Sequence, residues 1–153
     1  STFAQALEQH QPGTFRRCNQ DDLGNRRRVE ALARQTLQLG LSVCIDRTNF
    51  DAQQRAHWIR IARDFSATVR VLVFDTPVQV CLERLRTRTG HPTIKDFEQA
   101  SMVLDRFHSD FRYPELSEGY DKILYLKPSD HPSSHWLAEE IEGVLTRLEK
   151  SEP

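Results

Sequence analysis

Short apolar runs alternate with longer amphipathic segments along this chain of 153 residues. The apolar runs predict strands at residues 14–18, 41–45, 68–74 and 122–126. Segments with apolar side chains on one side predict helices at residues 3–9, 25–39, 52–65, 76–88, 96–107 and 133–148. Such alternation is typical of βα units that build a parallel sheet covered by helices. The predicted fold class is α/β, a three-layer α/β/α arrangement with a mainly parallel central sheet.

Residues at the predicted element ends support these boundaries. Gly40 suits the carboxyl end of a helix, Asp51 suits an N-cap, and Pro77 suits a first helical turn because it lacks an N–H group. The length suits one domain, which we expect over residues 1–150, with 151–153 as a frayed tail.

Composition narrows the class of protein further. The three cysteines are widely spaced and lie in or beside apolar stretches, which is typical of buried, reduced thiols in an intracellular protein. No stretch approaches the roughly 18 apolar residues of a membrane span, and no signal peptide opens the chain. The histidines share no ligand spacing. We therefore expect a protein of the cytoplasm or nucleus, with no membrane partner.

The net charge of -1 hides an uneven distribution of arginines. They gather at Arg26, Arg27 and Arg28, and again at Arg84, Arg86 and Arg88. Local basic patches bind phosphate even when the total charge is near zero, although exposed helix faces also carry arginines for solubility alone.

Polar residues follow each of the first three predicted strands. They are Asn19-Gln20-Asp21-Asp22-Leu23-Gly24, then Asp46-Arg47-Thr48-Asn49, then Asp75-Thr76-Pro77. In open α/β sheets, ligands bind beyond the carboxyl ends of the strands. The sequence therefore predicts a polar site along that edge.

The order and spacing of these segments resemble the polynucleotide 5′-kinase family of P-loop kinases. The resemblance rests on residues 19–24, on the helix ending at Gly40, and on residues 43–49 with Gln54-Arg55. It continues through an apolar strand, a helix bearing a basic lid (Cys81-Leu82-Glu83-Arg84, Arg88 and 90–93), and the acidic-glycine segment 114–120. The resemblance implies a P-loop NTPase-type fold, ATP and Mg²⁺ as cofactors, and DNA or RNA 5′ ends as partners.

By this resemblance, Ser1 and Thr2 read like the end of a phosphate-binding loop running into its helix. Ser1 would be a Mg²⁺ ligand, and both residues would bind the nucleotide phosphates. The glycine loop, its lysine and the strand before them are not in this sequence. Any helix N-cap can look like Ser-Thr, so the downstream pattern carries this interpretation.

The resemblance implies Asp21 as the carboxylate that orients the acceptor hydroxyl and takes its proton. The alternative role for Asp21 is to cap the helix beginning near Leu23, and Asp22 would support the site or cap. Asp46, at the end of an apolar strand, would contact Mg²⁺ directly or through water.

The remaining candidates bind substrate or transition state. Thr48 and Asn49 would contact the acceptor or hold the nearby backbone, with a side-chain turn as the alternative for Asn49. Arg55 would bind acceptor phosphate or pair with Asp51 four residues earlier. Arg84 and Arg88 share a helix face and would clamp the γ-phosphoryl group from a lid.

The family often has arginine where this sequence has Gln20, and some members have a basic acceptor-phosphate contact where it has Gly24. Arg26 to Arg28 would substitute for that contact. Two alternatives remain open: a kinase acting on a sugar or nucleoside, and a catalytically inactive scaffold domain. Fused repair or processing domains are further expected partners.

Overall fold

The computed structural model describes residues 2–87 and 96–153. Helices and strands alternate along most of it, in the order α1 Thr2–His10, β1 Phe15–Asn19, α2 Gln20–Leu23, α3 Arg26–Gln38, β2 Ser42–Asp46, α4 Ala52–Asp64, β3 Arg70–Phe74, α5 Val78–Thr87, α6 Phe97–Asp110, the 3₁₀ turn η1 Leu116–Glu118, β4 Lys122–Leu126 and α7 Ala138–Lys150.

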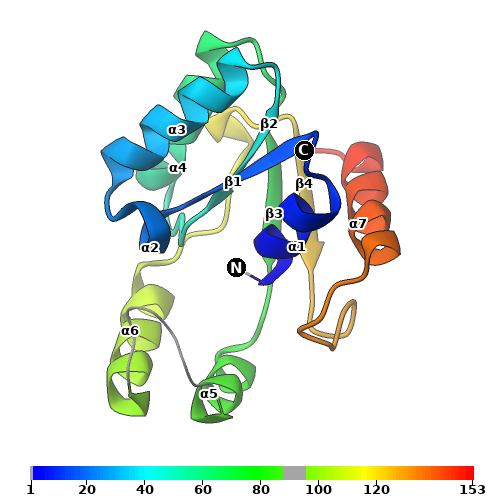
Figure 1. Ribbon diagram of the computed structural model, residues 1–153. Helices are drawn as coiled ribbons and strands as arrows, with labels where there is room; N and C mark the ends of the chain where they lie inside the picture. Colours follow the sequence, from blue (N-terminus) through cyan, green and yellow to red (C-terminus); the bar gives the residue numbers. More distant parts are fainter. Residues whose placement is uncertain (1, 88–95) are drawn as a thin grey trace.

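The strands form two parallel pairs rather than one continuous sheet (Figure 1). β1 pairs with β2 so that Asn19 lies opposite Asp46, and β3 pairs with β4 so that Phe74 lies opposite Leu126. In the part of the chain that the structure describes, β2 and β3 therefore each have one edge without a neighbouring strand.

Two apolar clusters lie on opposite faces of the first strand pair. Cys44 packs with α1 and α7 residues such as Phe3 and Ile141, whereas Val43 and Ile45 pack with the cluster of Val29 on α3. Side chains alternate between faces along a strand, so this division follows from the period of two. Helices cover both faces, which confirms the expected three-layer α/β/α class.

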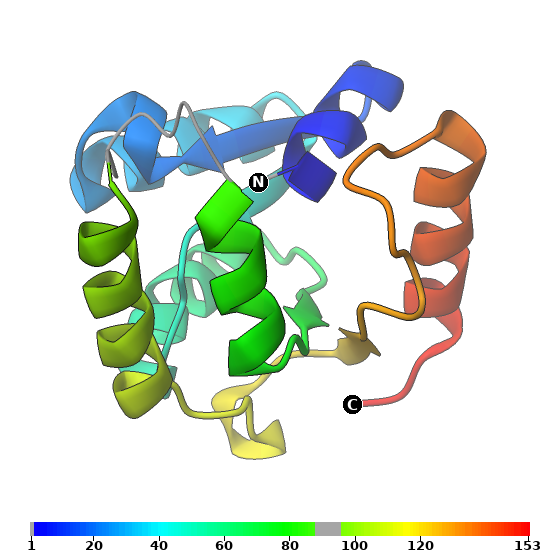
Figure 2. The ribbon, with the colours of Figure 1, turned by 90° about the horizontal axis from the view of Figure 1, so that it is seen from below.

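α5 and α6 stand apart from these layers at the bottom of Figure 1 and in the foreground of Figure 2. They contact each other, and Arg86 of α5 lies over the Phe97 ring of α6 at 5.8 Å. The predicted lid residues 90–93 between them, like Arg88 and Ser1, lie outside the described residues.

Most predicted elements are confirmed within a few residues, and the last helix is the main exception. It was expected from residue 133 but begins at Ala138, because the Leu137 backbone N–H donates to Glu140 Oε1 at 2.8 Å and fixes the start there. Trp136 instead packs edge-on against Phe3 in the core.

The expectation of buried cysteines holds fully only for Cys18. Cys44 and Cys81 are half-buried, and all three thiols are free. Burial raises the pKa of Cys18 to about 11. No helix in the described ranges is both long and apolar enough to cross a membrane.

Candidate active site

The carboxyl ends of β1 and β2 lie side by side, because Asn19 and Asp46 are register partners. The short helix α2 follows Asn19 directly and carries Asp21 and Asp22. Asn19 is its N-cap and accepts the Asp22 backbone N–H at 3.0 Å. The next helix, α3, is capped by Asn25. Asparagines therefore cap both helices, and the capping role that was the alternative for the two aspartates is already filled.

The Asp46 carboxylate is held in place by hydrogen bonds from β1. Its Oδ2 accepts from Arg17 Nε at 2.8 Å and from Asn19 Nδ2 at 3.1 Å. Arg17 also reaches Asp22 Oδ2 at 3.3 Å. Arg17 thus links the acid at the end of β2 to the acidic helix α2, a role that sequence reasoning missed.

No group of three or more His, Cys, Asp or Glu side chains suited to a metal ion occurs among the residues described. A Mg²⁺ site does not need such a group, because Mg²⁺ is commonly bound by one or two carboxylates together with substrate phosphates and water. A fixed carboxylate such as Asp46 at a strand end fits that kind of site.

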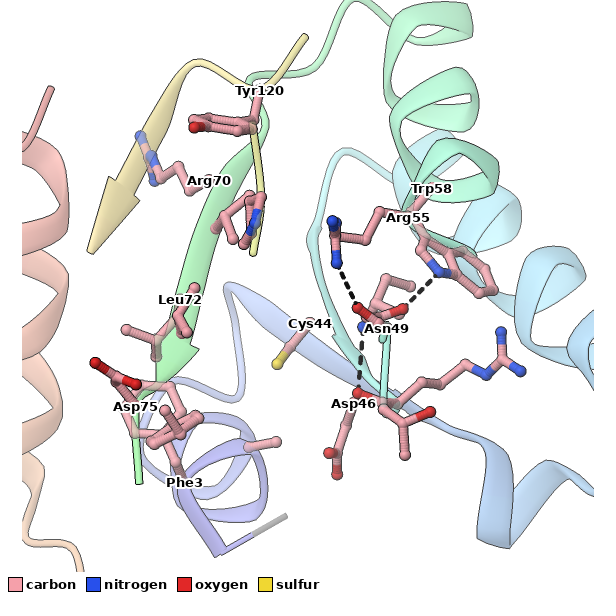
Figure 3. A pocket seen from close by; sticks show the side chains of 18 of the residues that line it. Phe3, Cys44, Asp46, Asn49, Arg55, Trp58, Arg70, Leu72, Asp75 and Tyr120 are labelled. Carbon is pink, nitrogen blue, oxygen red and sulfur yellow. Dashed lines mark hydrogen bonds between the residues drawn. The ribbon is translucent and has the colours of Figure 1, made fainter. Parts of the chain in front are cut away.

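Asn49 shapes the turn after β2. Its backbone is left-handed, with φ of 44°, and its Nδ2 donates to the Arg47 carbonyl at 3.3 Å. Its Oδ1 accepts from Trp58 Nε1 at 2.9 Å, as Figure 3 shows. The Asn49 side chain is therefore held by Arg47 and Trp58, rather than by the backbone N–H two residues on that the alternative of a side-chain turn requires. Thr48 beside it is exposed.

Arg55 is buried, with only 7% of the residue exposed. Its Nε and Nη2 donate to the two oxygens of Glu118 at 2.7 and 3.0 Å, and its Nη1 donates to the Asn49 carbonyl at 2.9 Å (Figure 3). The expected pairing with Asp51 is replaced by this pairing with Glu118, because Asp51 caps α4 by accepting the Gln54 N–H. The guanidinium group is thus committed to protein groups.

The pKa of Glu118 reflects two opposing causes. Burial alone would raise it, but the hydrogen bonds from Arg55 and from the Glu115 backbone N–H outweigh burial and lower the pKa below its ordinary value of 4.5. Glu118 is therefore ionised at neutral pH. Sequence reasoning noted its acidic-glycine segment but not this long-range partner.

A large cavity of about 1600 Å³ separates β2 from β3. It is lined along its length by both strands, with apolar groups such as Cys44, Leu72 and Phe3 (Figure 3). Asp46, Asp75 and Arg84 line it too, and the two acids stand at the carboxyl ends of their strands. The polar end of the cavity therefore coincides with the edge where sequence analysis expected the site.

The helix α1 begins at this same edge. Figure 3 shows Phe3 near Asp75 at the carboxyl end of β3, and the Phe3 and Phe74 ring centroids are 5.7 Å apart. Thr2 is exposed in the first turn of α1. A helix N-terminus presents unpaired N–H groups that favour anions. Phe3, Asp46 and Asp75 line the cavity, and Thr2 directly precedes Phe3 in α1.

Gly24 ends α2 in the left-handed region, with φ of 86°. A basic residue would be strained at that position. Arginines follow in the first turn of α3, where Arg26 is exposed. Arg84, on α5, is also exposed.

The family model AAA_33, described as an AAA domain, matches residues 1–114. The chain belongs to this family. Its AAA domain is P-loop kinase-like, in agreement with the parallel strands and covering helices of the fold.

Two curated relatives match this AAA domain at a distance. "Transcription factor bHLH140" from Arabidopsis thaliana is 30% identical over 107 residues, which are 70% of this chain and 12% of that protein. "Bifunctional polynucleotide phosphatase/kinase" from Schizosaccharomyces pombe is 27% identical over 109 residues, or 71% of this chain and 26% of that protein. The chain therefore spans only a small part of either relative.

Proposed function

We propose that this chain is a kinase domain that transfers the γ-phosphate of ATP to the 5′-hydroxyl of a polynucleotide end. The similarity to a polynucleotide phosphatase/kinase supports this choice within the P-loop kinase-like family. One structural observation carries it: the paired ends of β1 and β2 bring α2, with Asp21, beside the fixed Asp46 carboxylate.

In the proposed reaction, Asp21 accepts the proton of the 5′-hydroxyl group as its oxygen attacks the γ-phosphorus atom. A new P–O bond forms to the acceptor oxygen while the bond from phosphorus to the β-phosphate oxygen breaks. ADP leaves with the electron pair of that bond. Asp21 is exposed, so an acceptor can approach it from solvent.

Asp46 would hold Mg²⁺, which supplies positive charge near the β- and γ-phosphates when bound. Hydrogen bonds from Arg17 and Asn19 orient the Asp46 carboxylate for this task. Ser1 is proposed as a further Mg²⁺ ligand and, with Thr2, as a contact to the nucleotide phosphates at the start of α1. Arg84 and Arg88 are proposed to offset the charge that spreads over the γ-phosphoryl group.

The acceptor-binding residues expected from the sequence are Asp22, Thr48, Asn49, Arg55 and Arg26. The contacts of two of them favour indirect roles. Asn49 and Arg55 hold each other, Trp58 and Glu118, so we propose that they position the turn carrying Thr48 rather than contact the acceptor. Arg26 and Thr48 are exposed and suit direct contact.

The cavity between β2 and β3 supports a proposal about the phosphate-binding loop. Buried backbone N–H and C=O groups require partners, and strand edges facing such a gap are left without them. We propose that an additional strand lies between β2 and β3, joins the two parallel pairs into one sheet, and leads into a glycine loop before α1.

The test is transfer of labelled γ-phosphate from Mg-ATP to acceptors offered separately: 5′-hydroxyl DNA, 5′-hydroxyl RNA, nucleosides and sugars. The proposal expects label on an oligonucleotide, and the preferred strand identifies the acceptor. Oligonucleotides already carrying a 5′-phosphate are the matched control and should remain unlabelled. Label on a nucleoside or sugar with none on oligonucleotides would contradict the proposal and favour a small-molecule kinase.

A further inference from the structure

Arg47 has an unusual environment at the end of β2. Its guanidinium carbon lies over the Trp58 ring, 5.4 Å from the ring centroid. Its Nη1 is buried and has no hydrogen-bond partner within the described parts of the chain. A buried charged donor without an acceptor is costly, and such a group calls for a physical explanation, of which a bound anion is one.

A second arginine, Arg26, lies near the ring that Arg47 covers, because Arg26 contacts His57 and the His57 ring centroid is 6.4 Å from that of Trp58. Burial lowers the pKa of Arg47, and the positive charge of nearby Arg26 lowers it further, against the opposing effect of Glu30. Arg26 Nη1 is 3.0 Å from His57 Nε2, and its Nε is 3.8 Å from Glu30 Oε1. Two guanidinium groups thus face one carboxylate, which leaves an excess of positive charge.

These arginines flank the helix that carries Asp21. Arg47 directly follows Asp46, and Arg26 lies just beyond the glycine that ends α2. Leu23 of α2 and Trp58 of α4 pack against the same apolar cluster. Arg26 and Arg47 therefore lie near α2, which carries the proposed general base Asp21.

We propose that Arg47 and Arg26 bind a phosphodiester group of the acceptor strand, with the Arg47 guanidinium group stacked on the Trp58 ring. This inference rests on the proposed function, because it identifies what holds the acceptor beside Asp21. A guanidinium group donates two parallel hydrogen bonds to phosphate oxygens, and stacking on an aromatic ring fixes its plane. Contacts of this kind position a strand without reading its bases.

The test measures binding of fluorescent 5′-hydroxyl oligo-dT and oligo-dA by anisotropy across a series of salt concentrations, with no ATP present. Arg47→Gln and Arg26→Gln remove one charge each. Arg60→Gln removes one charge from an exposed position on α4 and is the matched control. Circular dichroism melting checks the folding of each variant, and the exposed Arg26 keeps the test decisive if Arg47→Gln fails to fold.

Each site substitution should weaken binding about tenfold or more, as expected for lost hydrogen bonds between charged groups. The slope of log K against log salt should become less steep by about 0.7 for each arginine removed from a single strand's phosphates. The loss should be equal for both oligonucleotides, and Arg60→Gln should bind like the unsubstituted protein.

An unchanged salt slope in folded Arg47→Gln or Arg26→Gln protein would overturn the inference. If Asp21-dependent transfer to oligonucleotides persists in that case, the proposed function stands alone. If oligonucleotides bind through Arg47 and Arg26 but receive no phosphate, the binding site stands and the proposed kinase activity fails. Absence of any oligonucleotide binding by the unsubstituted protein would overturn both.

Discussion

At the scale of single residues, the pair formed by Arg55 and Glu118 connects two distant parts of the chain. Their side chains are 8% and 9% exposed, and the pair joins α4 to the turn before β4. Arg55 also holds the Asn49 carbonyl in the turn after β2. A buried ion pair is not by itself a source of large stability, but losing one partner leaves the other charge buried. The pair should therefore fix the geometry of the turn beside Asp46.

Replacing Glu118 by glutamine should reveal this pair through the pH dependence of stability. The pKa of Glu118 is below its ordinary value of 4.5 in the folded protein. Its contribution is therefore complete above about pH 4.5 and is lost as the pH falls through the folded pKa. At pH 7 we expect Glu118→Gln to lower the free energy of unfolding by about 3 kcal/mol.

Urea unfolding between pH 7 and pH 3 measures the effect. Below pH 4.5 the stability curves of the unsubstituted protein and of Glu118→Gln should converge, whereas exposed Glu142→Gln should run parallel to the unsubstituted protein. Parallel curves for Glu118→Gln would show that the pair does not contribute as described.

At the scale of elements, α2 and its two flanking asparagines position the acidic residues. Asn19 and Asn25 each cap a helix in the same manner, through a side-chain oxygen that accepts a backbone N–H at 3.0 Å. Only Asn19 of these two also donates to Asp46 in the described structure. The pair therefore offers a matched comparison between capping and positioning.

Asn25→Ala should lower the free energy of unfolding by about 1 kcal/mol, the usual cost of a lost N-cap. Asn19→Ala should lower it by more, because it also removes the buried hydrogen bond to Asp46. Only Asn19→Ala should also lower kcat for phosphoryl transfer, since the Asp46 carboxylate loses a hydrogen bond and α2 its anchor. Steady-state kinetics with thermal melts of both variants would check this. Equal kcat values for the two would remove Asn19 from the account.

Helices and strands could be predicted where a few neighbouring residues mark the element or its end. The β4 strand was predicted at its observed limits because five apolar-rich residues stand between polar turns. The Asp51 cap was predicted because aspartate is one of the residue types preferred at a helix N-cap. By contrast, α2 has only four residues, too few for any periodicity, and no helix was predicted there.

The predicted site combines local signals with contacts that the sequence does not encode locally. Asp21 and Asp46 were placed at one edge because parallel strands end together, and the register of Asn19 with Asp46 agrees. Asp51, given as one alternative partner for Arg55, was wrong because the observed partner, Glu118, is 63 residues away along the chain. Arg47 received no role, because its stacking on Trp58 requires the packing of α4.

At the scale of the whole molecule, a cavity lined by β2 and β3 lies between the two strand pairs. If an additional strand lies there, both edges of β2 and of β3 are hydrogen-bonded, whereas β1 and β4 each keep one edge free. Residue-resolved hydrogen exchange on the naturally expressed protein distinguishes these arrangements, because successive strand amides point to opposite edges.

We expect successive amides of β2 and β3 to exchange slowly, and amides of β1 and β4 to alternate between slow and fast. The outer strands thus serve as the internal control. Alternating exchange in β2 and β3 as well would contradict the proposed strand.

The most direct test of the central claim is the rate of γ-phosphate transfer from Mg-ATP to a 5′-hydroxyl oligonucleotide by Asp21→Asn and Asp22→Asn proteins. Each substitution removes one negative charge from α2, and the Asp22 carboxylate is paired with Arg17. If Asp21 is the general base, Asp21→Asn should reduce kcat by about 10²- to 10⁴-fold, with a much smaller loss for Asp22→Asn. Transfer at the full rate by folded Asp21→Asn would contradict the account.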